Sequence, residues 1–284
     1  MGLSGYALDP ADPRAPTHEQ WEAMSPAERE RVVQMLPSEL PRRTAPEGDL
    51  HRIPKEKATG ALGEFFRRMG RRVYLSAELP VYYPGEPWFA PDLIAVLDVD
   101  PDARDRWVVS AEGKGLDFVL EITLSGDRRK DLEKNVARYA SLGIPEYFIL
   151  DLRAQRIVGY RLDSERPGSY TAIVPQAGRW ASGVLGLDLV MEGGRIRFYA
   201  GSAELLETDE LIGRLTRMVD GLVRKQEDLA RTLEEERRRA SRLEERASSA
   251  EERASSAEER AARLAERLRA LGVDPDEPDP VDRG

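Results

Sequence analysis

The sequence predicts an α/β fold, in which a mixed β-sheet flanked by helices is followed by a long C-terminal coiled-coil helix. Short apolar runs of strand length and two amphipathic segments occupy residues 52–200. One amphipathic segment, 127–142, separates two strand-like runs, which is the order of a parallel crossover unit. From about residue 203, apolar residues recur at alternating steps of three and four, the spacing of a coiled coil.

Composition excludes several classes of function. The 284 residues include 43 basic and 52 acidic side chains, a net charge of −9, so bulk charge does not hold this chain on nucleic acid or on a membrane. The absence of cysteine excludes disulfides, thiolate nucleophiles and cysteine-ligated metals, and His18 and His51 are the two histidines. Without an apolar run of roughly 20 residues or a signal peptide, we expect a cytoplasmic protein with no membrane contact.

Residues 1–50 predict a loose N-terminal arm with short helices. This segment is rich in Pro, Glu and Arg, and it contains a helix start at Ser25, Pro26 and Glu28, with the N-cap, first-position and capping-box residues in order. The globular domain is predicted over residues 51–202.

The globular domain opens with a predicted amphipathic helix over residues 55–70, whose apolar positions are three and four apart and which ends at Gly70. Strand-like runs follow at 73–75, 79–83, 93–97, 107–109, 118–124, 147–152, 157–162, 170–174 and 196–199, with a hairpin expected between residues 109 and 117. A second helix over 127–142 is closed by Gly143 and Pro145. The later strands have no helices between them, which predicts antiparallel extension of the sheet.

Residues 203–272 predict a helical coiled coil, and residues 273–284 a disordered tail. The seam has one four-residue stutter, and the heptad at 246–252 is repeated at 253–259. Alanine fills much of the seam and buries little area. We expect residues 205–271 to join copies of the chain or to bind a partner protein; parallel, antiparallel and folded-back arrangements all remain open. The seam residues are Leu215, Met218, Leu222, Leu229, Leu233, Ala240, Leu243, Ala247, Ala250, Ala254, Ala257, Ala261, Leu264, Leu268 and Leu271.

Two carboxylates stand on apolar strands. Asp92 follows Pro91 and opens the run 93–97, and Glu121 interrupts the run 118–124. Strand alternation puts Glu121 on the face of Val119 and Thr123. If adjacent strands bring the two acids together, a divalent metal relieves their repulsion, and hard oxygen ligands suit Mg²⁺ or Mn²⁺. The alternative is that each acid has an arginine partner in the core.

Three segments resemble a known family: Phe-Ala-Pro-Asp at 89–92, Leu-Glu-Ile at 120–122 and Arg-Tyr-Ala-Ser-Leu-Gly-Ile-Pro-Glu-Tyr at 138–147. They are similar to the Uma-type restriction endonuclease family of the PD-(D/E)XK restriction-endonuclease-like superfamily, over roughly residues 52–200. The resemblance implies a restriction-endonuclease-like mixed sheet. It further implies that Asp92, Glu121 and the main-chain carbonyl of Ile122 bind Mg²⁺ or Mn²⁺, and that the protein is a metal-dependent endonuclease hydrolysing DNA phosphodiester bonds with the help of a catalytic lysine.

The sequence departs from the superfamily pattern at one position. Thr123 stands two residues after Glu121, where the pattern has lysine. The resemblance then implies that the lysine comes from the following helix, where Lys130 and Lys134 are candidates and where Asn135 takes the position that relatives commonly give to lysine. Each lysine has an ordinary solvated role as its alternative. A catalytically weak or inactive scaffold acting through its coiled coil is the competing function.

Further residues are candidates for accessory roles. The resemblance implies that Glu64 is a candidate third acid and that His51 is a candidate for a role near the substrate; Thr123 is a further candidate accessory residue. Glu64 and His51 also fit ordinary structural roles. Basic clusters at the end of the first helix and the start of the second supply candidate contacts to the DNA backbone, with a solvated surface as the alternative. These contacts are expected from Arg67, Arg71, Arg128 and Arg129.

Overall fold

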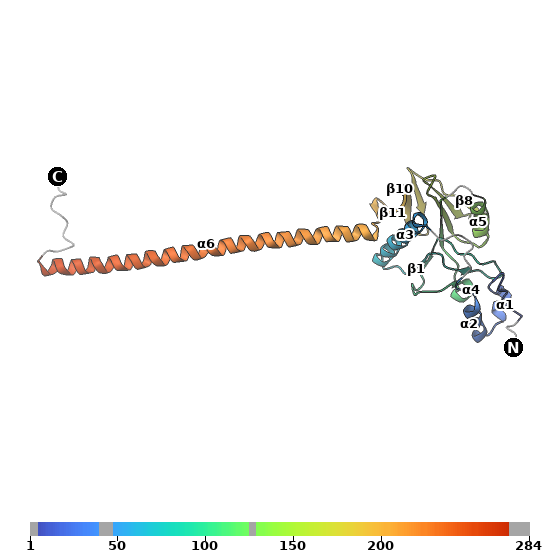
Figure 1. Cartoon of the computed structure of the whole chain (residues 1–284), viewed down its shortest axis with the longest axis horizontal. Helices are drawn as coiled ribbons and strands as arrows, with labels where there is room; N and C mark the ends of the chain where they lie inside the picture. Colours follow the sequence, from blue (N-terminus) through green and yellow to red (C-terminus); the bar gives the residue numbers. More distant parts are fainter. Residues whose placement is uncertain (1–4, 40–47, 125–128, 273–284) are drawn as a thin grey trace. The chain divides into compact units, whose positions relative to one another are not determined.

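The structure is a computed structural model that describes residues 5–39, 48–124 and 129–272; over residues 129–133 it describes the backbone alone. The chain forms two units, residues 1–212 and 213–284, each with its own internal contacts. Figure 1 shows the elements in chain order. None of the helices in the described part of the chain combines the length and the apolar composition that crossing a membrane requires.

The central sheet of the first unit is mixed, as predicted. Its six strands follow the order β1-β3-β5-β6-β7-β8. Strands β5 and β6 pair in parallel and the other neighbours pair antiparallel. Helix α5 (Arg129–Ser141) connects the parallel pair, which confirms the crossover unit. The strands are β1 (Val73–Ser76), β3 (Leu93–Leu97), β5 (Phe118–Thr123), β6 (Glu146–Asp151), β7 (Arg156–Leu162) and β8 (Tyr170–Ala172).

The two faces of this sheet bury different side chains of β5. Leu120 and Ile122 pack in one cluster with Leu62 and Phe66 of helix α3 (Asp49–Arg68), whereas Val119 packs in a second cluster with Tyr139 of α5. This is the alternation predicted for the strand.

A second, four-stranded antiparallel sheet has the order β12-β11-β10-β9. The sequence predicted only its strand at 196–199, and predicted it as part of the first sheet, which is wrong. Strands β10 (Leu187–Glu192) and β11 (Arg195–Ala200) form a hairpin whose turn is Gly193 and Gly194, both at positive φ. Leu187 and Leu189 close the core beneath α3. The edge strands are β9 (Arg179–Ser182) and β12 (Ala203–Glu204).

The N-terminal segment is packed, which corrects the expected loose arm. Helices α1 (His18–Ala23) and α2 (Pro26–Met35) each begin with a capping box. Trp21, Val32 and Leu36 are buried in one cluster with Tyr82 and Val108, so the aromatic and aliphatic side chains of this segment hold it on the domain.

Between strands β3 and β5, the short strand β4 and a short helix replace the expected hairpin. Strand β2 (Val81–Tyr82) pairs with β4 (Trp107–Val108), and α4 (Val109–Glu112) follows directly. Gly113 ends α4 at a φ of 68°, a left-handed conformation that glycine adopts without strain.

Helix α3 begins at Asp49, earlier than the predicted start at residue 55, and contains Pro54 in its second turn. The earlier start places His51 and Lys55 one turn apart on one face of the helix.

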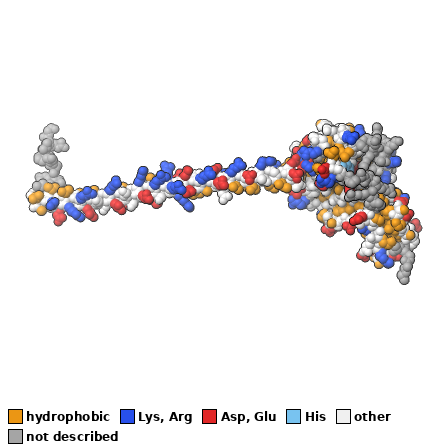
Figure 2. Space-filling view, in the orientation of Figure 1, with side chains coloured by type: hydrophobic (Ala, Val, Ile, Leu, Met, Phe, Trp, Pro, Cys, Tyr) orange, Lys and Arg blue, Asp and Glu red, His pale blue; other side chains and the backbone are white. Residues whose placement is uncertain are grey.

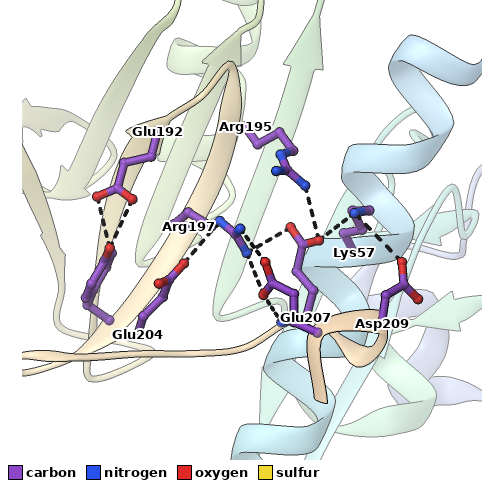
Figure 3. Close-up of polar contacts among 9 residues, drawn as sticks. Lys57, Glu192, Arg195, Arg197, Glu204, Glu207 and Asp209 are labelled. Atoms are coloured by element: carbon purple, nitrogen blue, oxygen red, sulfur yellow. Dashed lines mark hydrogen bonds and ion pairs between the residues drawn. The ribbon is translucent and has the colours of Figure 1, made fainter. Parts of the chain in front are cut away.

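Ion pairs join α3, β11 and the chain before helix α6 (Thr208–Ala270), as Figure 3 shows. Glu207, only 5% exposed, lies 2.5 Å from the Nζ atom of Lys57 and 3.1 Å from the Nη1 atom of Arg197. Arg197 also contacts Glu204 and Glu210. These pairs fix residues 204–210 on the first unit.

The second unit is built from α6, the long C-terminal helix that the sequence predicts. The helix starts at Thr208 rather than near residue 203, because Ala203 and Glu204 pair with β11. The predicted division of the chain into the segments 1–50, 51–202, 203–272 and 273–284 otherwise stays a prediction.

Replacing Leu36 by alanine tests whether the N-terminal segment belongs to the folded domain. Leu36 is 1% exposed, so the cavity should lower the free energy of unfolding by about 2–5 kcal/mol. The adjacent Met35→Ala is the control, because Met35 is 46% exposed and should change little. Equal urea midpoints for the two variants would contradict the packed arrangement.

Candidate metal centre

Antiparallel pairing of β3 with β5 brings the two predicted carboxylates together. Leu93 lies opposite Leu120, so Asp92, just before the first residue of β3, lies beside Glu121. The backbone N–H of Asp92 donates to Oε2 of Glu121 at 3.4 Å, and the N–H of Ile122 donates to Oδ2 of Asp92 at 2.6 Å. Asp92 and Glu121 thus contact each other through the backbone of the two strands.

Helix α3 adds two further groups to this place. The Nε2 atom of His51 lies 2.7 Å from the carbonyl oxygen of Ile122 and 3.2 Å from Oδ2 of Asp92. The Nζ atom of Lys55 lies 2.5 Å from Oε1 of Glu78 and 3.8 Å from Oδ1 of Asp92. Lys55 is 3% exposed, and the side chains of His51 and Asp92 are each 13% exposed, so these charges interact with little screening by water.

The environment makes a negative charge on Glu121 costly. Burial, and next the neighbouring charge of Asp92, raise the pKa of Glu121 to about 8. The hydroxyl of Tyr139 donates to Oε1 of Glu121 at 2.9 Å and opposes that shift. Burial, and then the charge of Glu121, in turn raise the pKa of Tyr139 well above its ordinary value. A cation beside the two carboxylates would favour the ionised form of Glu121.

The donor atoms suit a divalent metal. Asp92, Glu121 and the Ile122 carbonyl offer oxygens, the ligands that Mg²⁺ and Mn²⁺ prefer. A partly different set, His51, Glu78 and Asp92, also has one ligand atom each within 4.8 Å of one another. Asp92 belongs to both sets and is therefore the central ligand candidate.

The other predicted site residues lie in varied places. Thr123 is buried on β5, next to the centre. Lys134 is exposed on α5 and Asn135 is half-buried beside it. Arg128 and the side chains of Arg129 and Lys130 lie outside the described residues.

The basic end of α3 is occupied with its own acids. Glu64 pairs with Arg67 at 2.7 Å and with Arg68 at 2.6 Å, and these hydrogen bonds lower the pKa of Glu64. Arg71 lies over the ring of Phe66 and pairs with Asp98. The structure therefore gives Glu64, Arg67 and Arg71 local partners rather than a contact with Asp92 or Glu121.

Sequence reasoning missed Lys55 and Glu78. A signal for Lys55 existed, because positions 55, 58, 62 and 66 form the buried face of α3 and lysine is the charged member of that series. Glu78 carried no comparable pattern, since it precedes a short strand and has a φ of 52°.

The fold and the site define an α/β protein with two carboxylates in contact on adjacent strands of its mixed sheet. The chain belongs to the Uma2 family, described as putative restriction endonucleases, whose family model matches residues 19–192. This confirms the family resemblance of the sequence. The chain is also similar to the crystal structure of a putative nuclease belonging to DUF820 from Anabaena variabilis, at 14% identity and a TM-score of 0.40, over 52% of this chain and 79% of that one. No curated protein matches the sequence.

Glu121→Gln should stabilise the metal-free protein as the pH rises. The folded pKa of Glu121 lies above its ordinary value of 4.5, so the wild type loses stability between that value and about pH 8, whereas glutamine does not titrate. In chelator, the melting temperature of the variant should exceed that of the wild type by about 2 °C or more at pH 9, and by less at pH 5.

The matched control is Glu259→Gln, a change of the same type at a side chain that is 68% exposed on α6. It should leave the melting temperature unchanged at both values of pH. A Glu121→Gln difference that shrinks on going from pH 5 to pH 9 would contradict the raised pKa.

Proposed function

We propose that this protein is a metal-dependent endonuclease that hydrolyses DNA phosphodiester bonds at the carboxylate centre. The observation that carries the proposal is the contact between Asp92 and Glu121 on adjacent strands, beside the Ile122 carbonyl. These three groups would hold Mg²⁺ or Mn²⁺. The bound ion supplies a nucleophilic water at neutral pH and neutralises charge that develops on the phosphate.

We assign the positive charge that Thr123 does not supply to Lys55. Its Nζ atom is buried and lies 3.8 Å from Oδ1 of Asp92, so its charge acts at the centre itself. A lysine there can hold a phosphate oxygen or orient the attacking water. Lys134 and Lys130 of the following helix are the alternatives, and Lys134 is exposed.

His51 and Tyr139 would tune the two ligating carboxylates. The Nε2 atom of His51 lies within hydrogen-bond distance of both the Ile122 carbonyl and Asp92, so it can hold or pass a proton at either oxygen. The hydroxyl of Tyr139 orients the Glu121 carboxyl from the opposite side. Contacts of Arg128 and Arg129 with the DNA backbone belong to the same proposal, whereas Arg67 and Arg71 already have acidic partners.

Calorimetric titration with Mg²⁺ and Mn²⁺, together with plasmid nicking on the same samples, tests the proposal. Asp92→Ala should lose carboxylate-dependent metal binding and lower the nicking rate by about 100-fold or more, and so should Glu121→Ala. Nicking that survives both changes would exclude this centre.

Lysine replacements then locate the catalytic cation. Lys55→Met should lower the nicking rate by about 100-fold while metal binding persists. Lys134→Met is the matched control on α5 and should nick at the wild-type rate. The reverse outcome would assign the role to Lys134.

A scaffold that acts through its C-terminal helix is the second candidate function. Two observations favour it: Thr123 replaces the lysine of the superfamily pattern, and the apolar seam of α6 is exposed. If wild-type protein and Asp92→Ala nick equally slowly while residues 205–271 still mediate association with another copy or a partner protein, the scaffold is the better description.

A further inference from the structure

Helix α6 exposes an apolar seam along its length. Leu215, Leu222, Leu243 and Leu264 are each between 56% and 66% exposed, although leucine is usually buried. Figure 2 shows basic and acidic side chains interspersed along the same helix. The positions of these charges relative to the seam identify what covers it.

The charges on the two edges of the seam have opposite signs. With Ala240, Ala247 and Ala254 at heptad position a, and Leu243 and Ala250 at position d, the edge positions g and e follow from the sequence. Arginine stands at g and glutamate at e. The g positions are Arg239, Arg246, Arg253, Arg260 and Arg267, and the acidic e positions are Glu244, Glu251 and Glu258.

This pattern selects one orientation of two helices. In a parallel pair, each g position meets the e position five residues later in the other chain, so Arg239, Arg246 and Arg253 meet glutamates. In an antiparallel pair, g meets g and e meets e, which brings arginine onto arginine and glutamate onto glutamate. We propose that two copies of this chain associate through α6 as a parallel, in-register coiled coil.

The register and the number of chains follow from the seam. The repeated heptad allows a slip of seven residues without changing the alanine layers, but a slip would set Leu243 against Ala250 and Leu264 against Ala257. The in-register pair stacks every leucine of the seam on its counterpart, including Leu243 and Leu264, and therefore buries the most apolar area. Over residues 239–260 the e and g positions are charged, so the apolar stripe there is limited to a and d, the width that suits two helices.

A folded-back arrangement within one chain does not compete, because α6 is continuous from Thr208 to Ala270. Residues 1–212 precede the coil in each copy, so a parallel pair joins both first units to the same end. An antiparallel pair would attach them about 90 Å apart, from the rise of 1.5 Å per residue. The association does not require nuclease activity; only its use in cutting both strands of a duplex rests on the proposed function.

Because the chain has no cysteine, single cysteines report the orientation in the full-length protein. Ala261→Cys, at position a, should form a disulfide-linked dimer on mild oxidation, because residue 261 meets its counterpart in the parallel in-register pair but meets residue 217 in an antiparallel pair that overlaps over the whole of Thr208–Ala270. Ala262→Cys, at the outward position b, is the matched control and should cross-link at least tenfold more slowly. A mixture of Met218→Cys and Ala261→Cys should give no 218–261 product; that product, or a wild type that sediments as a monomer or as more than two chains, would overturn the proposal.

Charge reversal tests the pairing independently. The triple change Arg239→Glu, Arg246→Glu and Arg253→Glu should weaken dimer association at least tenfold, with helix content checked by circular dichroism. Adding Glu244→Arg, Glu251→Arg and Glu258→Arg restores opposite charges and should bring the affinity back to within threefold. The control triple Arg238→Glu, Arg242→Glu and Arg263→Glu makes the same change in net charge at positions c and f, and should leave association unchanged.

The proposed pairing would be overturned if both triple variants weakened dimer association equally, or if the variant with all six changes did not recover its affinity. Loss of plasmid nicking in a protein that still forms the parallel dimer would count against the proposed endonuclease and not against this inference. The two failures are therefore distinguishable on the same samples.

Discussion

The pairing of β3 with β5 is the contact on which the rest of the candidate site depends. Its register sets Asp92 beside Glu121 and turns the N–H of Ile122 onto the Asp92 carboxylate. Helix α3 packs on one face of β5 and supplies His51 and Lys55, while α5 packs on the other face and supplies Tyr139. One strand thus collects groups from both helical layers, and a shift of its register by one residue would turn Glu121 to the opposite face.

The centre is built at a cost to stability. Two carboxylates in contact, with little water around them, raise the free energy of the folded chain whenever both are ionised. The polar groups around them offset only part of this cost: Lys55 and His51 lie on the Asp92 side, and Tyr139 donates to Glu121. A site that is unfavourable by itself and favourable with a bound cation is what a metal-binding function requires. This physical conflict supports the proposed metal site at Asp92 and Glu121.

The sequence predicts the β-strands of this centre well and its helix less well. Apolar alternation located Glu121 on its face, and the order strand, helix, strand predicted the parallel pair β5 and β6, because both signals are local. Lys55 was missed because the predicted helix began only at residue 55, which left His51 outside it and hid the face that the two residues share. Glu78 was missed because its approach to Lys55 depends on tertiary packing. The second sheet was not predicted for a similar reason, since its short strands are defined by a glycine turn and by burial under α3.

In α6 the apolar seam residues and the charged edge residues would play different roles in association. In the proposed dimer, apolar burial is strongest where leucine occupies the seam and weak across the alanine layers, so the middle of the helix contributes little free energy from area alone. Small side chains at the seam nevertheless let two backbones approach, which brings the e and g charges of neighbouring helices within reach of one another. Surface ion pairs are individually weak, yet a wrong orientation would replace every attractive pair by a repulsive one. In the proposed dimer the charges therefore decide the orientation of the two helices, and the leucines decide their register and most of the affinity.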